Sequence, residues 1–147
     1  HGGIVFWVDT TGQHGLVCAL VDQSTGIQWY NNDTNTITNA VRDGLGAGMY
    51  NTERIIASQS TGSYAAQLCA NYQGGGYGDW YLPSKYELNL LYAQRRALVG
   101  GGFAKVFYWS STESVAKSAW GHDFSDGYDS YDGGKFLKGW VRAVRAF

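Results

Sequence analysis

The chain of 147 residues is poor in charged side chains. Asp, Glu, Lys and Arg make up 16% of it, against about 25% in typical globular domains. With this composition we exclude a coiled coil, whose outer positions are usually charged. No apolar run approaches the roughly 18–20 residues of a membrane-spanning helix. The opening HGGIVFWVD lacks the basic start and long apolar core of a signal peptide, so we expect any export signal to lie outside this sequence.

Cysteine is also scarce. The two cysteines, Cys18 and Cys69, are too few for a disulfide framework and lack the paired spacing of a zinc site. One disulfide between them and two buried free thiols are both compatible with the sequence. The disulfide alternative requires a location outside the cytosol.

Motifs of the common enzyme classes are missing. The sequence has no GxSxG, Walker or HExxH motif, and GGGYGDW lacks the strand–turn–helix context of a dinucleotide site. The three histidines, His1, His14 and His122, are scattered. Because Cys18 is predicted to face the core, it is a poor nucleophile for His14 to activate. We therefore expect a protein that is not an enzyme.

Glycine and aromatic residues are abundant instead. The chain has 21 Gly, 6 Trp, 11 Tyr and 6 Phe, a mixture that favours turn-rich antiparallel structure over long surface helices. The length suits one domain over residues 1–147. Tyr128 and Tyr131 are the aromatic residues that we expect to be exposed, where a sugar ring could stack on them.

Hydrophobic periodicity predicts an α+β fold. Residues 4–8 and 16–21 form a predicted hairpin, in which Leu16, Cys18 and Leu20 share a core face. The other predicted strands are 27–30, 106–111, 118–124 and 139–147, and the predicted short helices are 52–58 and the stripe that contains Cys69. A third helix begins at a capping box formed by Ser84 and Glu87.

Charge is divided unevenly along the chain. Residues 1–78 carry two bases and five acids, a net charge of −3, whereas residues 79–147 carry nine bases and seven acids, a net charge of +2; together they give −1. This total predicts no general attraction to nucleic acid or to an anionic membrane. Any polyanion site must therefore be a local patch of bases.

Four aspartates recur at every third position in HDFSDGYDSYDGGK, namely Asp123, Asp126, Asp129 and Asp132. Carboxylates on a glycine-rich loop suit calcium. The spacing does not match an EF-hand loop, and a step of three residues alternates faces of a strand. We therefore expect a solvated hairpin loop and keep the four aspartates as weak calcium candidates, with no other metal or cofactor.

Four arginines have structural alternatives. Arg95 and Arg96 fall near the C-terminal end of the predicted third helix, where cations complement the helix dipole, so they either stabilise that helix or bind a ligand. Arg142 and Arg145 lie on opposite faces of the last predicted strand, among apolar neighbours. An arginine in that setting is usually tied to a carboxylate or a carbonyl, and we expect structural roles for both.

The chain resembles the Lcl C-terminal domain family, named after a bacterial collagen-like protein. The similarity rests on ordered blocks that include GGIVFWVDTTGQHGL, DQSTGIQWYN, GSYAAQLCANY, GGYGDWYLPSKYELNLLY, GGFAKVFYWSSTE, AWGHDF and VRAVRAF. It implies a secreted or cell-surface adhesin module with a C-type-lectin-like fold. It also implies a homotrimer that binds sulfated glycosaminoglycans such as heparin, with roles in cell adhesion, biofilm formation and virulence.

The candidate sulfate contacts are bases chosen by charge rather than by motif: Arg95, Arg96, Lys105, Lys117, Lys135 and Lys138. Lys and Arg bind sulfate through charge-assisted hydrogen bonds. Two alternatives remain open. One is a lectin for neutral sugars that uses calcium or the exposed tyrosines, and the other is a structural module for trimerisation or display.

Overall fold

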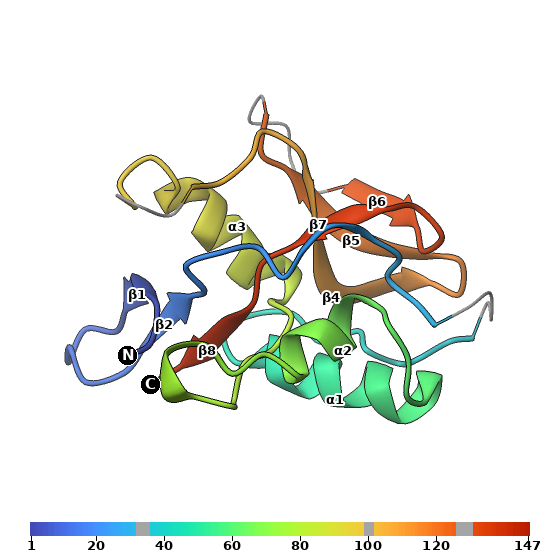
Figure 1. Cartoon of the computed structure of the whole chain (residues 1–147), viewed down its shortest axis with the longest axis horizontal. Helices are drawn as coiled ribbons and strands as arrows, with labels where there is room; N and C mark the ends of the chain where they lie inside the picture. Colours follow the sequence, from blue (N-terminus) through green and yellow to red (C-terminus); the bar gives the residue numbers. More distant parts are fainter. Residues whose placement is uncertain (32–35, 99–101, 126–130) are drawn as a thin grey trace.

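The computed structural model describes residues 1–31, 36–98, 102–125 and 131–147 (Figure 1). Its strands are β1 Ile4–Val8, β2 Gly15–Cys18, β3 Ser24–Ile27, β4 Phe107–Val115, β5 Ser118–Asp123, β6 Tyr131–Gly134, β7 Gly139–Val141 and β8 Val144–Ala146. Its helices are α1 Ala47–Gln59, α2 Ala65–Ala70 and α3 Lys85–Gln94, together with a 3₁₀ turn at Gly74–Gly76. The predicted α+β class is confirmed.

The strands form two sheets joined by the C-terminal segment. The smaller sheet has the order β1-β2-β8 and the larger one the order β3-β7-β4-β5-β6. The pairs are antiparallel, except for β4 with β7. Helices α1 and α2 pack together on one side, and α3 packs against β1 and β5 (Figure 1). No helix within the described ranges has the length and apolarity needed to cross a bilayer.

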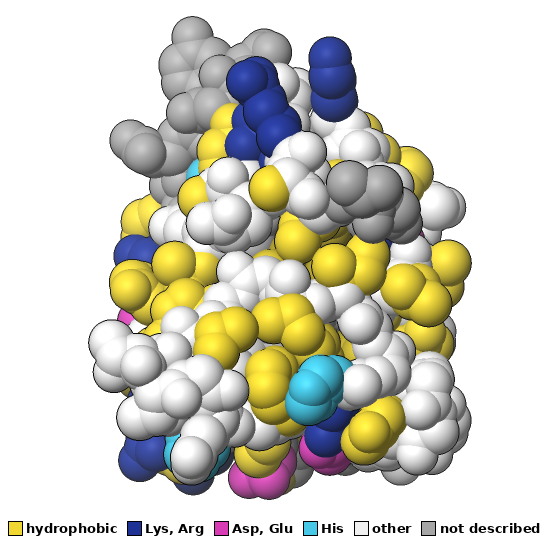
Figure 2. Space-filling view, turned by 90° about the vertical axis from the view of Figure 1, so that its left-hand side faces the viewer, with side chains coloured by type: hydrophobic (Ala, Val, Ile, Leu, Met, Phe, Trp, Pro, Cys, Tyr) yellow, Lys and Arg dark blue, Asp and Glu magenta, His cyan; other side chains and the backbone are white. Residues whose placement is uncertain are grey.

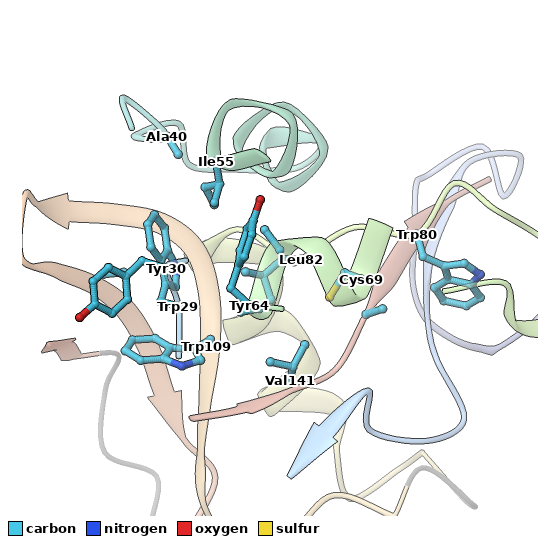
Figure 3. Packing of buried hydrophobic residues seen from close by; sticks show 14 of the residues in the cluster. Trp29, Tyr30, Ala40, Ile55, Tyr64, Cys69, Trp80, Leu82, Trp109 and Val141 are labelled. Atoms are coloured by element: carbon cyan, nitrogen blue, oxygen red, sulfur yellow. The ribbon is translucent and has the colours of Figure 1, made fainter. Parts of the chain in front are cut away.

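Most predicted elements are present, with shifted ends. The hairpin of β1 and β2 is confirmed, but β2 ends at Cys18, and Leu20 is exposed. The strand predicted at residues 27–30 ends earlier because Trp29 leaves the sheet to enter the core. Its indole Nε1 donates to the Ser110 carbonyl at 2.8 Å, and Figure 3 shows it packed near Trp109 and Tyr30.

Of the two alternatives left open for the cysteines, the structure has two buried free thiols, Cys18 and Cys69, and no disulfide between them. β2 is buried on both faces. Cys18 packs into the cluster that holds Leu88 of α3, whereas its neighbour Val17 packs into the other cluster, with Cys69 of α2. The two thiols therefore point into different parts of the core. Burial raises the pKa of Cys18 to about 11, which keeps it protonated and unreactive at neutral pH.

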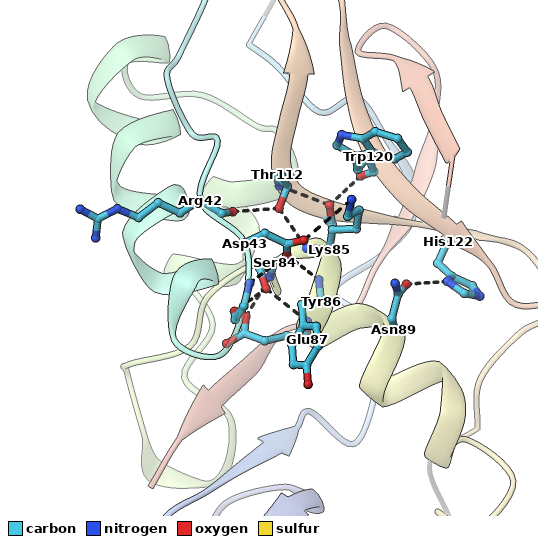
Figure 4. A network of polar contacts seen from close by, with 12 residues as sticks. Arg42, Asp43, Ser84, Lys85, Tyr86, Glu87, Asn89, Thr112, Trp120 and His122 are labelled. Atoms are coloured by element: carbon cyan, nitrogen blue, oxygen red, sulfur yellow. Dashed lines mark hydrogen bonds and ion pairs between the residues drawn. The ribbon is translucent and has the colours of Figure 1, made fainter. Parts of the chain in front are cut away.

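The predicted capping box at the start of α3 is confirmed and also holds a second helix. Ser84 Oγ accepts from the Glu87 amide, and Glu87 Oε2 accepts from the Ser84 amide at 2.8 Å (Figure 4). Glu87 Oε1 accepts from the amide of Gly46, the N-cap of α1, at 2.8 Å and from the Tyr81 hydroxyl at 3.1 Å. Burial raises the pKa of Glu87, while these donors act against that shift. One carboxylate thus fixes the starts of α1 and α3.

A buried ion pair fastens β4 to the turn after β6. Lys135 Nζ lies 2.5 Å from Glu113 Oε1, and both side chains are 2% exposed. The same carboxylate accepts from the Thr38 and Asn39 amides at 2.9–3.1 Å, while the ammonium lies 4.6 Å from the centre of the Trp29 ring. Burial lowers the pKa of Lys135, and the hydrogen bond to Glu113 opposes this shift. The pair anchors the loop before α1 to the sheet.

Lys135→Met should lower the free energy of unfolding by about 3–5 kcal/mol, because it leaves the buried Glu113 carboxylate without its counter-ion. The measurement is urea denaturation followed by circular dichroism. Lys117→Met is the matched control: this side chain is exposed, and its replacement should change stability by less than about 0.5 kcal/mol. Equal effects of the two substitutions would contradict the assignment of a buried ion pair.

Candidate functional site

A basic hollow of about 230 Å³ lies at the C-terminal end of α3. It lies between the end of this helix, the segment before β4 and the end of β5. We refer to it below as the basic hollow. Its lining consists of Arg95, Arg96, Phe103, Ala104, Lys105, Phe124 and Ser125. Three of the six predicted sulfate contacts therefore meet at one place: the adjacent Arg95 and Arg96, and Lys105 from the segment before β4. Figure 2 shows Lys and Arg side chains gathered at the end of this face where α3 terminates.

Arg95 is held firmly by its own helix. Its Nη1 donates to the Tyr92 carbonyl at 2.7 Å, and its guanidinium lies 3.5 Å from the centre of the Tyr92 ring. The Tyr92 carbonyl also accepts from the Arg95 amide at 3.2 Å, so the backbone and the side chain of Arg95 both bond this end of α3, where its positive charge complements the helix dipole. The structural role foreseen for Arg95 is thus present, and the same side chain also lines the basic hollow.

Arg96 and Lys105 are the exposed cations of the basic hollow. Among residues 1–31, 36–98, 102–125 and 131–147, no hydrogen bond or ion pair engages either side chain. An anion that enters the hollow does not have to displace an internal carboxylate from these two groups. They are therefore the side chains best placed to bind one.

The floor of the basic hollow is aromatic, which charge-based reasoning missed. Phe103 and Phe124 line it, with ring centroids 5.5 Å apart. Arg142 lies 4.3 Å from the centre of the Phe103 ring and is itself 2% exposed. Since this guanidinium is buried, the ring face that it covers is the inner one. The sequence signal for this floor was that Phe103 stands two positions before Lys105, one of the bases chosen by charge.

A polar network beneath the floor holds the segment before β4. Arg142 Nε donates to Asp22 Oδ1 at 2.7 Å, and its Nη2 reaches the Gly102 carbonyl at 3.4 Å. The Tyr108 hydroxyl donates to Asp22 Oδ2 at 3.3 Å and accepts from the Ala104 amide at 3.1 Å. Burial, with the nearby Asp22 charge, raises the pKa of Tyr108 to about 12, so the phenol stays neutral. The backbone on both sides of Phe103 is thereby fixed to the core.

The predicted structural roles of Arg142 and Arg145 are confirmed. Arg142 pairs with Asp22, as described above. Arg145 forms two bonds to Asp79, Nε to Oδ1 at 2.6 Å and Nη2 to Oδ2 at 2.9 Å. This hydrogen-bonded pair lowers the pKa of Asp79 and raises that of Arg145. Neither arginine is available to a surface ligand.

Lys117 and Lys138 lie away from the basic hollow. Both are exposed. Lys117 occupies the turn between β4 and β5, whereas the basic hollow lies near the other end of that hairpin, about 25 Å away at 3.3 Å per strand residue. Lys138 lies beside Gly26 of β3, an edge strand of the larger sheet. Lys117 and Lys138 therefore do not belong to the basic hollow.

The assignment of Lys135 to a surface patch is wrong. Its ammonium is buried against Glu113 and the Thr36 carbonyl, so it cannot reach a polymer at the surface. The sequence suggested otherwise because a lysine between glycine and phenylalanine, in a predicted turn, is usually exposed. Its partner stands 22 residues earlier in the chain, and no local pattern connects the two.

Only part of the aspartate run can be placed, because Asp126 and Asp129, together with Tyr128, lie outside the described residues. Asp123 accepts from the Ser125 amide, and Asp132 accepts from the hydroxyls of Ser114 and Ser118. Asp132 lies on β6, opposite Trp120. Nowhere in the described part of the chain do three or more His, Cys, Asp or Glu side chains form a group that could hold a metal ion.

A second hollow has the opposite charge. It measures about 250 Å³ and lies between α1 and residues 78–81. Its lining includes Glu53, Asp79 and Trp80 but no lysine or arginine. A polyanion would meet two carboxylates there. Of these two hollows, the basic one is therefore the candidate for an anionic ligand.

The architecture and the site together define an α+β domain with a small, rigid, cationic hollow and two internal arginine–carboxylate pairs near its C-terminus. The family described as Lcl C-terminal domain matches residues 19–145. The chain belongs to this family. A comparison with curated proteins found no match.

Tyr108→Phe should loosen the floor of the basic hollow without removing any group that lines it. The Ala104 amide and the Asp22 carboxylate each lose a buried partner, which should cost about 1–3 kcal/mol of unfolding free energy. Hydrogen exchange should show faster exchange of the Ala104 amide. Tyr131→Phe is the control, since this tyrosine is exposed and its change should leave that exchange rate unaltered. An unchanged rate in Tyr108→Phe would contradict the network.

Proposed function

We propose that this domain is an extracellular adhesin module that binds sulfated glycosaminoglycans at the basic hollow and has no catalytic activity. One observation carries the proposal: Arg95, Arg96 and Lys105, each chosen from the sequence for its charge, line a single hollow. Family membership supports an adhesin-like module of a collagen-like protein. The corresponding location is secreted or on the bacterial surface.

The chemistry of the polymer suits this site. Sulfate groups stay ionised at all relevant pH values, and lysine and arginine bind them through charge-assisted hydrogen bonds. Binding also releases counter-ions from the polyanion, as it does from nucleic acids, and this makes the affinity fall with salt. A local site can therefore hold an acidic polymer although the chain has a net charge of −1.

Replacing Arg96 and Lys105 together by Glu should weaken heparin binding by at least about tenfold. It should also reduce the slope of log affinity against log salt by about two, one for each lost ionic contact. The measurement is heparin binding by calorimetry at several salt concentrations. Both side chains are exposed, so the fold should be unaffected.

The matched control is the double substitution of Lys117 and Lys138 by Glu, which changes the net charge equally. We expect a much smaller loss, because these lysines lie outside the basic hollow. If the control weakened binding as strongly as the Arg96 and Lys105 pair, attraction would be diffuse. If only the control weakened it, the site would lie elsewhere.

We further propose that the domain functions as a homotrimer, as the family resemblance implies. Three copies of a modest site along one long polymer could raise avidity by about 10²–10⁴ without any new contact. Sedimentation equilibrium should give three times the mass of the chain. A monomer that still bound long heparin chains tightly would remove the avidity argument but not the site.

A further inference from the structure

The basic hollow combines cations with an aromatic floor, a pairing that simple polyanion attraction does not need. Beside Arg96 and Lys105 it presents Phe103, which is half-buried and packs against the buried Phe124. Its volume of about 230 Å³ is below the roughly 300–1,000 Å³ of sites for drug-sized molecules. It is therefore suited to one small unit of a polymer rather than to an extended stretch.

We infer that the basic hollow recognises a single sulfated sugar unit, with the apolar face of its ring on Phe103 and its sulfate between Arg96 and Lys105. This rests on the proposed function and adds to it that Phe103 determines specificity. A sugar ring has an apolar face that packs on an aromatic ring, whereas inorganic sulfate and polyphosphate have none. The floor thus favours sulfated carbohydrate over other anions of equal charge.

The position of Phe103 supports this role. Arg142 covers its inner face, and Phe124 and Tyr108 lie beside it, with ring centroids at 5.5 and 6.2 Å. The adjoining Gly102 carbonyl and Ala104 amide are bonded to Arg142 and Tyr108. Because the ring is already fixed, a sugar that packs on it does not have to order it first, and such preorganisation favours affinity.

The test compares three small probes by calorimetry on the intact chain: N-acetylglucosamine 6-sulfate, unsulfated N-acetylglucosamine and inorganic sulfate. The sulfated sugar should bind about three- to tenfold more tightly than sulfate, the gain typical of one aromatic contact. The unsulfated sugar should show no saturable binding. Polyphosphate should displace the sulfated sugar less well than heparin of equal charge.

Two substitutions distinguish a role of the Phe103 ring in binding from a role in maintaining the fold. Phe103→Leu keeps an apolar side chain but removes the ring, and should reduce the preference for the sulfated sugar over sulfate to about one. Phe103→Tyr keeps the ring and should retain the preference. The affinity for inorganic sulfate should stay the same in both variants, which also reports that the cations remain in place.

Equal affinity of the intact chain for sulfate and the sulfated sugar would overturn the inference, as would an equal loss of preference in Phe103→Leu and Phe103→Tyr. Heparin binding measured in parallel distinguishes the two levels of failure. Retained heparin binding with no preference for the sulfated sugar overturns the role of Phe103 alone. Absence of heparin binding by the unsubstituted chain overturns the proposed function itself.

Discussion

The ion pair between Asp22 and Arg142 connects the core of this domain to its surface site. Asp22 lies between β2 and β3, and Arg142 lies between β7 and β8, so the pair joins the two segments that cross from one sheet to the other. A buried guanidinium is costly unless several acceptors surround it. Asp22, the Ala19 carbonyl and the Gly102 carbonyl supply them. Gly102 directly precedes Phe103. The hydrogen bond that the buried Arg142 donates to the Gly102 carbonyl therefore also holds the backbone of the residue that forms the floor of the basic hollow.

Internal pairing of charges decides which cations are left for a ligand. Residues 79–147 contain nine lysines and arginines, of which Lys135, Arg142 and Arg145 are buried against carboxylates. Arg95 is engaged by the end of its own helix. A count of charge along the sequence treats all nine as equal. Lys85, another of the nine, lies 3.8 Å from Asp43. Besides Arg95, the cations of this half that form no ion pair among the described residues are Arg96 and Lys105 in the basic hollow, and Lys117 and Lys138 away from it.

Features that depend on local sequence were predictable, whereas those that depend on distant partners were not. The capping box pairs Ser84 with Glu87, three positions later. The β1–β2 hairpin can be predicted from the apolar runs of its two strands and the glycines between them. Strand periodicity showed that Cys18 points inward, but it could not show that both faces of β2 are buried, so the choice between a disulfide to Cys69 and two free thiols stayed open. The strand β6 was missed because YDGG has little strand propensity and is held by pairing with β5. For the same reason, charge alone located Arg95, Arg96 and Lys105 but could not reveal Phe103.

The basic hollow stands at an unusual end of a helix for an anion site. Anions usually bind at helix N-termini, where free amides and the positive end of the dipole attract them, but this hollow lies at the C-terminus of α3. The negative end of the helix dipole there would repel a sulfate. Arg95 offsets this repulsion, because it bonds the Tyr92 carbonyl and places a positive charge over the negative end of the dipole. In the proposed function, Arg96 and Lys105 then attract the ligand, and their long, exposed side chains act mainly through charge. Binding at the proposed site should therefore depend strongly on salt, and in our proposal the aromatic floor supplies the one contribution to specificity that salt does not weaken.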